Sequence, residues 1–207
     1  MDDPNLPEEV VDRVHRGLIR VHRWLGNTRA ITRAIRRDPL PVVTVLDVGC
    51  GAGGMLAEIQ RRLDVEVIGV DLRVPAHAPR NVSLYAADAV HDRLPRADVA
   101  FCAMLAHHLS EAELTAVIRN VSRSCRRFII LDLVRHRLPL ALFRLFIYPF
   151  LGRLNALDGV RSIERAYTPA ELRKVVARAL PGSTARIRHT VAPFQVRQMI
   201  DITYLPE

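Results

Sequence analysis

Three aspartates close three apolar segments, and the first of them precedes a glycine-rich stretch. Asp47 lies in VLDVGCGAGG (residues 45–54), Asp71 ends VIGVD and Asp88 ends VSLYAAD. If these segments are strands of one parallel sheet, the carboxylates lie along the edge where such sheets bind ligands. At that edge Asp71 suits two ribose hydroxyls and Asp88 suits an adenine amino group. The spacing therefore predicts a site for a cofactor that carries a nucleoside.

The glycine-rich stretch does not identify the cofactor by itself. Gly49, Gly51 and Gly54 form the pattern G-x-G-x-x-G, which lets the backbone approach a ligand at a helix N-terminus. A nicotinamide cofactor also needs an acid about 20 residues further on, so Asp71 does not separate the possibilities. Asp47 does, because a dinucleotide-binding strand is usually apolar at this position. A carboxylate there suits a ligand that brings a cation, such as the ammonium of S-adenosyl-L-methionine.

In these segments the sequence resembles the class I S-adenosylmethionine-dependent methyltransferases (EC 2.1.1.-). VLDVGCGAGG, VIGVDL, AADA and ADVAFCAMLAHHLS are similar to their first four motifs, and together they cover residues 35–135. The resemblance implies S-adenosyl-L-methionine as cofactor and a methylated acceptor. The cofactor-binding residues that it implies, together with the neighbours that we assign to the same site, are Asp47, Gly49, Cys50, Gly51, Gly53, Asp71, Leu72, Asp88, Ala89 and Ala103.

Two flanking segments extend the resemblance. RVHRWLGNTRA (20–30) and DGVRSIERAYTPAEL (158–172) are similar to segments of small bacterial methyltransferases associated with polyketide or quinone-like aromatic products of secondary metabolism. They favour a lipophilic small-molecule acceptor. We expect O-methylation of an aromatic, polyketide or quinone-like compound, with C-methylation as the close variant.

Two histidines follow the fourth predicted strand, in LAHHLS. His107 or His108 could be the general base that removes a phenol proton, because an imidazole titrates near pH 7. Alternatively, both could hold this loop in place by hydrogen bonds. Cys50 is not expected to act as a nucleophile, since methyl transfer from a sulfonium needs none, and it is interpreted as a small residue that fills the turn.

Alternation of apolar strands with helices predicts an α/β fold. We expect a Rossmann-like, seven-stranded, mostly parallel sheet with helices on both faces, closed by an antiparallel pair. Thr168 and Pro169 mark the start of a late helix. The single predicted domain, 1–207, is divided into an N-terminal helical cap (1–37), a cofactor-binding core (38–135), a helical insertion after the fifth strand (136–165) and a C-terminal helix with closing strands (166–207).

Two apolar segments could cover the acceptor. The insertion contains LPLALFRLFIYPFLG (138–152), and residues 8–25 have the periodicity of an amphipathic helix. As a lid they would expose Trp24, Arg144 and Tyr148 to the substrate. The alternative is that both segments only pack against the sheet.

Composition limits the other functions. The net charge is +8 with Lys174 as the only lysine, and the three cysteines have no metal-ligand spacing. The polar start MDDPNLPEEV is not a signal peptide and no segment is long enough to span a bilayer, so we expect a cytoplasmic protein without a metal.

A positive surface can favour nucleic acid, yet AMLAHHL lacks the Asn/Asp-Pro-Pro-aromatic and Pro-Cys motifs of nucleobase methyltransferases. We therefore expect no nucleic acid partner. An RNA or DNA methyltransferase, a non-catalytic cofactor-binding protein and a nicotinamide oxidoreductase remain the alternatives.

Overall fold

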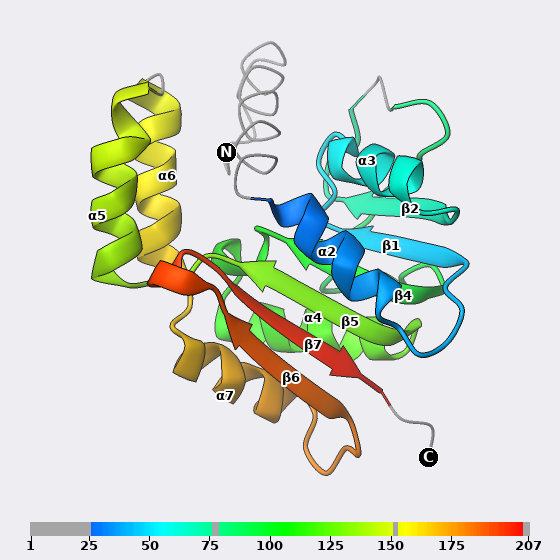
Figure 1. The fold of residues 1–207 in the computed structure, drawn as a ribbon. Helices are drawn as coiled ribbons and strands as arrows, with labels where there is room; N and C mark the ends of the chain where they lie inside the picture. The colour runs from blue at the N-terminus through cyan, green and yellow to red at the C-terminus, as the bar shows by residue number, and fades with distance from the viewer. Residues whose placement is uncertain (1–25, 76–78, 151–152, 205–207) are drawn as a thin grey trace.

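A seven-stranded sheet forms the centre of the molecule in the computed structural model, which describes residues 26–75, 79–150 and 153–204. The strand order is β3-β2-β1-β4-β5-β7-β6; β1 to β5 run parallel, and β7 is antiparallel to both of its neighbours (Figure 1). The predicted fold class is confirmed. The strands are β1 (Thr44–Val48), β2 (Glu66–Asp71), β3 (Ser83–Ala86), β4 (Ala97–Ala103), β5 (Cys125–Asp132), β6 (Arg186–Val191) and β7 (Gln198–Thr203).

Helices cover both faces of this sheet, as the alternating sequence predicted. One face carries α2 (Asn27–Arg36) and α3 (Gly54–Arg62), and the other carries α4 (Glu111–Ser122) and α7 (Pro169–Ala179) (Figure 1). Successive strand residues point to opposite faces. Val45 and Ile129 therefore belong to the core beneath α2 and α3, whereas Leu46 and Ile130 belong to the core beneath α4 and α7.

Local capping fixes where α4 and α7 begin. Ser110 and Glu113 form a capping box before α4, and Thr168 and Glu171 form another before α7, with a proline at the first helical position. Each box satisfies backbone N–H groups that have no partner inside the helix. Thr168 and Pro169 have the positions predicted for them.

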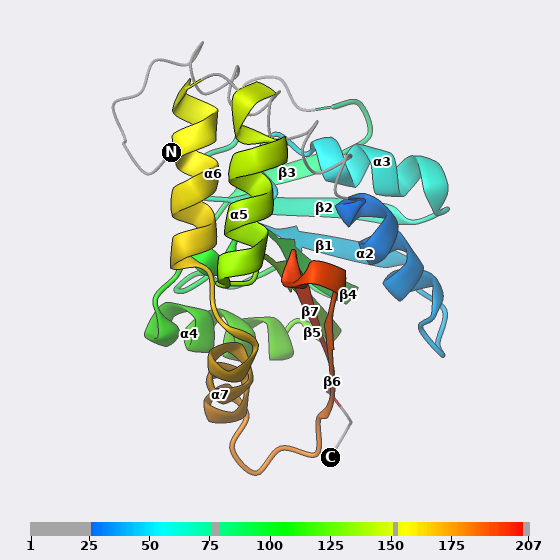
Figure 2. The same cartoon turned by 60° about the vertical axis from the view of Figure 1, so that its left-hand side comes forward.

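The insertion after β5 is a helical hairpin. It consists of α5 (Arg137–Phe146), the short helix η2 (Tyr148–Phe150) and α6 (Arg153–Arg165). The two long helices lie side by side and project beyond the carboxyl end of β5 (Figures 1 and 2). They approach closely at Gly159, where an added Cβ would lie 2.3 Å from Cζ of Phe143. The predicted helix at 8–25 and Trp24 lie outside the described residues.

Candidate active site

The glycine loop is held between the carboxyl ends of β1 and β2. The N–H groups of Gly49 and Cys50 donate to the carbonyl of Val70 at 2.8 and 3.1 Å. Oδ2 of Asp71 accepts from the N–H of Gly51 at 2.8 Å, and Oδ1 accepts from the N–H of Arg73 at 3.2 Å. Asp71 therefore orders the glycine loop, a role that the sequence pattern did not reveal.

Only glycine fits the first position of this loop. Gly49 has φ +79°, and an added Cβ would lie 3.0 Å from the δ carbons of Leu105, which follows β4. A left-handed backbone and a close neighbour both disfavour a side chain here. The loop is thus enclosed between β2 and the segment after β4.

Asp47 is a buried acid near the end of β1. The residue is only 3% exposed, and no other described residue donates a hydrogen bond to its carboxylate. Burial, and then the nearby charge of Asp71, raise the pKa of Asp47 well above its ordinary value. An unpaired buried carboxylate is costly, and a cation at this position would remove the cost. The structure thus brings Asp47 and Asp71 together on the neighbouring strands β1 and β2, as predicted.

Asp88 has a different environment from the other two acids. It lies two residues beyond the end of β3, in a turn where Oδ1 accepts from the N–H of Val90 and Oδ2 lies 2.8 Å from Nδ1 of His91. The contact with His91, and then the backbone bond from Val90, lower the pKa of Asp88. Both oxygens already have a partner, so the adenine contact predicted for Asp88 requires a shared or rearranged oxygen.

The remaining residues of the predicted cofactor site surround this edge of the sheet. Leu72 is 71% exposed just after β2, and Ala103 ends β4. The carbonyl of Ala89 accepts from Nδ2 of Asn120 on α4, which leaves its N–H as the group available to a ligand. Cys50 is buried, and burial, with the charges of Asp47 and Asp71, raises the pKa of its thiol. Such a thiol is a poor nucleophile, which agrees with the interpretation of Cys50 as a packing residue.

His107 and His108 lie in a short helix, η1 (Ala106–His108), directly after β4. His107 is 7% exposed, and its Nδ1 lies 2.7 Å from Oδ1 of Asp132, the last residue of β5. The N–H of His107 also donates to Oδ2 of Asp132 at 3.0 Å. His108 is exposed, with its ring centroid 4.2 Å from that of His107. Asp132 was missed in the sequence, although it ends a strand as Asp71 does.

This geometry selects one tautomer of His107. A carboxylate only accepts hydrogen bonds, so Nδ1 of the neutral ring must carry the hydrogen. Nε2 then holds the lone pair, which is the form that a general base needs. The burial of the pair shows equally that it anchors η1 to β5.

Residues 45–127 match the model of a protein family described as "Methyltransferase domain". This part of the chain belongs to that family. The match includes the glycine loop, Asp71, Asp88 and both histidines, and it confirms the family predicted from the motifs. No curated protein matches the chain.

Solved structures share the fold of the methyltransferase domain and its flanks. The plantazolicin methyltransferase BamL, in complex with a triazolic desmethylPZN analog and SAH, has a TM-score of 0.75 at 13% identity, covering 96% of this chain and 91% of its own. Magnesium protoporphyrin IX methyltransferase (ChlM) from Synechocystis PCC 6803, with bound SAH, has a TM-score of 0.60 at 19% identity and coverages of 98% and 90%. Human N-acetylserotonin methyltransferase, in complex with SAM, has a TM-score of 0.65 at 15% identity and coverages of 94% and 55%. At these identities the likeness establishes the shared fold.

Two of the predicted substrate residues lie on the helical hairpin. Arg144 on α5 is exposed and 3.6 Å from Glu164 on α6, and Tyr148 is half-buried in η2. Since α6 packs against η1, the hairpin adjoins the histidines. At its base is a hollow of 360 Å³. The hollow is lined by Arg135, His136, Arg137, Leu140, Ile163 and Glu164.

Two further features concern ligands and membranes. Within 26–75, 79–150 and 153–204, no group of three or more His, Cys, Asp or Glu side chains is arranged to hold a metal ion. Over the same residues, no helix combines the length and the apolar character that crossing a bilayer requires.

Proposed function

We propose that the protein transfers the methyl group of S-adenosyl-L-methionine to a lipophilic small molecule. The observation that carries this proposal is Asp47, a buried carboxylate beside the glycine loop to which no other described residue donates a hydrogen bond. An ammonium group placed there gains a charge-assisted hydrogen bond and offsets the cost of the buried acid. A nicotinamide cofactor has no ammonium to offer at this position.

The other residues of the site fit the remaining parts of this cofactor. Each oxygen of Asp71 accepts one backbone N–H, from Gly51 or from Arg73, and a carboxylate oxygen can accept a second bond, so Asp71 could also accept from ribose hydroxyls. The N–H of Ala89, together with Asp88, would bind the adenine end, and the backbone of Gly49 would bind the methionine end. When bound, the cofactor supplies an electrophilic methyl group on a sulfonium. The protein's contribution is to align the acceptor with that group, and positioning of this kind is worth roughly 7–11 kcal/mol.

For an oxygen acceptor, His107 is the base that we propose. Asp132 holds the ring in the tautomer whose Nε2 can take a proton from a phenol. The proton moves from the acceptor oxygen to Nε2, and the imidazolium that forms is stabilised by the carboxylate of Asp132. We propose O-methylation of an aromatic, polyketide or quinone-like acceptor on this basis; N-acetylserotonin and magnesium protoporphyrin IX, named for two of the solved methyltransferases, are likewise ring compounds.

The helical hairpin supports a lipophilic acceptor. On α5, Leu138, Leu145 and Phe146 are exposed by 40%, 65% and 57%. Large apolar side chains on one helix favour contact with an apolar partner. Because α6 lies against η1, an acceptor held by the hairpin would be close to His107.

A direct assay tests the proposal. The full chain is incubated with S-adenosylmethionine labelled on the methyl group and a panel of phenols and quinols, and the products are separated by organic extraction. We expect label in at least one lipophilic product, and micromolar binding of S-adenosylhomocysteine by calorimetry. Binding of NADH without binding of S-adenosylhomocysteine would overturn the proposal.

A further inference from the structure

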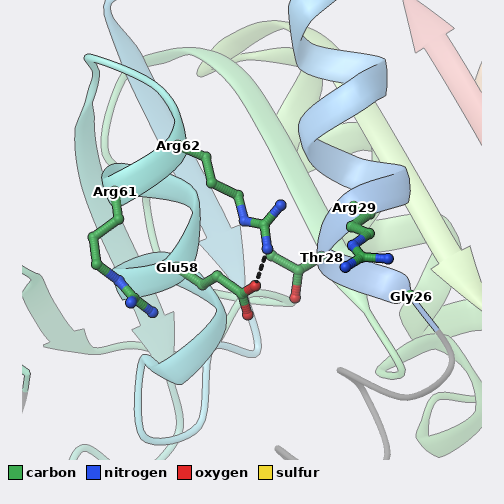
Figure 3. Close-up of a pocket in the computed structure, with 6 residues that line it drawn as sticks. All are labelled: Gly26, Thr28, Arg29, Glu58, Arg61 and Arg62. Atoms are coloured by element: carbon green, nitrogen blue, oxygen red, sulfur yellow. Dashed lines mark hydrogen bonds and ion pairs between the residues drawn. The ribbon is translucent and has the colours of Figure 1, made fainter.

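A hollow separate from the strand-end site lies between α2 and α3. Its volume is 510 Å³, and it is lined by Gly26, Thr28, Arg29, Glu58, Arg61 and Arg62. Figure 3 shows Glu58 and Arg62 extending from α3 toward Thr28, with Arg29 beside Thr28 on α2. Residues of the glycine loop and the strand ends do not line it, so the proposed cofactor site does not explain it.

The lining carries more positive than negative charge. Nη2 of Arg62 pairs with Oε1 of Glu58 at 2.5 Å. Arg29 and Arg61 have no carboxylate partner among the described residues, and both are exposed. Two guanidinium groups are thus left to face the hollow without a counter-charge, which favours a ligand with two negative charges.

The start of α2 adds donors to the same wall. The first bond within the helix runs from the N–H of Ala30 to the carbonyl of Gly26, so the N–H groups of Thr28 and Arg29 have no carbonyl partner inside the helix. Gly26 provides no side-chain cap, and the first turn contains no acid. The positive end of the helix dipole therefore faces the hollow without a compensating carboxylate.

Thr28 supplies an independent sign of a ligand. The residue is only 4% exposed and lines the hollow, yet its hydroxyl forms no hydrogen bond with another described residue. Although the residue as a whole is buried, this hydroxyl is open to the hollow and can bond to a molecule there. A tetrahedral oxyanion in the hollow would accept from this hydroxyl, from the helix N–H groups and from the guanidinium groups of Arg29 and Arg61. Nε of Arg61 also donates to the carbonyl of Ala57 at 3.2 Å, which leaves its two terminal nitrogens for the ligand.

We propose that the cleft between α2 and α3 binds the dianionic phosphate group of a small phosphomonoester. The size of the hollow is that of small-molecule sites. A small ligand is favoured over a nucleic acid because Glu58 stands in the same wall and would repel a continuous run of phosphates. The site is independent of methyl transfer, since none of its residues belongs to the proposed cofactor site.

Calorimetry with phenyl phosphate, in a low-salt buffer free of phosphate and sulfate, tests the site. We expect saturable binding that is about tenfold weaker in Arg29→Gln and in Arg61→Gln, since each loses a charge-assisted contact. Thr28→Val should weaken binding about threefold. Phenyl sulfate, a monoanion of similar shape, should bind more weakly than phenyl phosphate.

Arg33→Gln is the matched control, because Arg33 is exposed one turn further along α2 and does not line the hollow. It should bind phenyl phosphate like the unchanged protein. The affinity for S-adenosylhomocysteine should be the same in all four variants, which separates this site from the proposed function. Equal weakening by Arg33→Gln and Arg29→Gln would overturn the proposal, because it indicates only diffuse attraction. Tighter binding of a single-stranded RNA oligonucleotide than of phenyl phosphate, again with equal sensitivity to Arg33→Gln, would also overturn it.

Discussion

Nδ1 of His107 lies 2.7 Å from Oδ1 of Asp132, and the backbone N–H of His107 donates to the other oxygen of the same carboxylate. The N–H of Leu133 donates to Oδ1 as well. One buried carboxylate therefore fixes both the backbone and the ring of His107. The ring cannot turn without breaking a bond between buried groups, which is costly.

If His107 is the base, His107→Gln should lower kcat by roughly 10²–10⁴-fold and leave the affinity for S-adenosylhomocysteine similar. The assay is turnover of labelled cofactor with the best phenol from the panel, followed from pH 6 to pH 9. His108→Gln is the matched control and should retain most of the turnover. If His107→Gln turns over almost normally and keeps its pH profile, the pair serves only to anchor η1.

Asp132→Asn tests the positioning of that base. An asparagine has one acceptor oxygen, and its amide would point donor hydrogens at a histidine group that also donates. We expect a lower kcat, a shifted pH profile and a loss of about 2–3 kcal/mol in the free energy of unfolding. Denaturant melts measure the free energy of unfolding, and kcat measured as a function of pH tests whether Asp132 positions His107 for catalysis. Loss of stability with an unshifted pH profile would restrict Asp132 to a structural role.

Asp47 should make the unliganded protein less stable as the pH rises. Its folded pKa is raised, first by burial and then by Asp71, so the folded state holds a proton that the unfolded state releases above about pH 3.9. The stability contributed by this group is therefore present below that pH and is lost as the pH rises through the raised pKa.

Asp47→Asn removes this effect. We expect the variant to gain roughly 1–3 kcal/mol in the free energy of unfolding at pH 8, and less at pH 5. Binding of S-adenosylhomocysteine should fall at least tenfold, so the ligand should stabilise the variant much less than the unchanged protein. Urea denaturation at both pH values, with and without ligand, measures both effects. Unchanged affinity for the ligand would show that Asp47 does not hold the ammonium.

Asp71→Ala should weaken cofactor binding by at least tenfold. Two losses combine, because the carboxylate is placed for the ribose hydroxyls and also accepts from Gly51 in the glycine loop. Calorimetry with S-adenosylhomocysteine measures the effect. Asp64→Ala, which removes an exposed acid between α3 and β2, should bind normally. A folded Asp71→Ala protein with unchanged affinity would contradict the assignment.

The α5–α6 hairpin should respond to ligands. We expect amide hydrogen exchange in residues 138–165 to slow when cofactor and a lipophilic phenol are both present, and to change little with cofactor alone. Gly159→Ala should disturb the packing of α5 against α6, because the added Cβ would displace the ring of Phe143. We expect this to lower the free energy of unfolding by about 1–3 kcal/mol. Its KM for the acceptor should rise more than its Kd for S-adenosylhomocysteine. Equal exchange rates with and without acceptor would show that the hairpin does not bind the acceptor.

The sequence alone determined the order and type of most described elements. Apolar strands alternate with amphipathic helices between residues 42 and 134, and such local periodicity depends on burial rather than on any particular partner. Asp47 and Asp71 could be placed together because β1 and β2 are successive parallel strands, whose carboxyl ends meet at one edge. Capping boxes likewise act within four residues, so the start of α7 at Thr168 and Pro169 was predictable.

Only the tertiary structure decided which groups meet across long distances in the chain. His107 and Asp132 are 25 positions apart and come together because β4 and β5 are neighbours and η1 folds back over β5. The environment of Asp88 depended on where β3 ends, because a turn beyond the strand brings its carboxylate to His91. The cleft between α2 and α3 depends on how two helices pack on one face of the sheet. Periodicity encodes which side of each helix is buried, but the gap left between Thr28 and Glu58 is set by the packed side chains of both helices together.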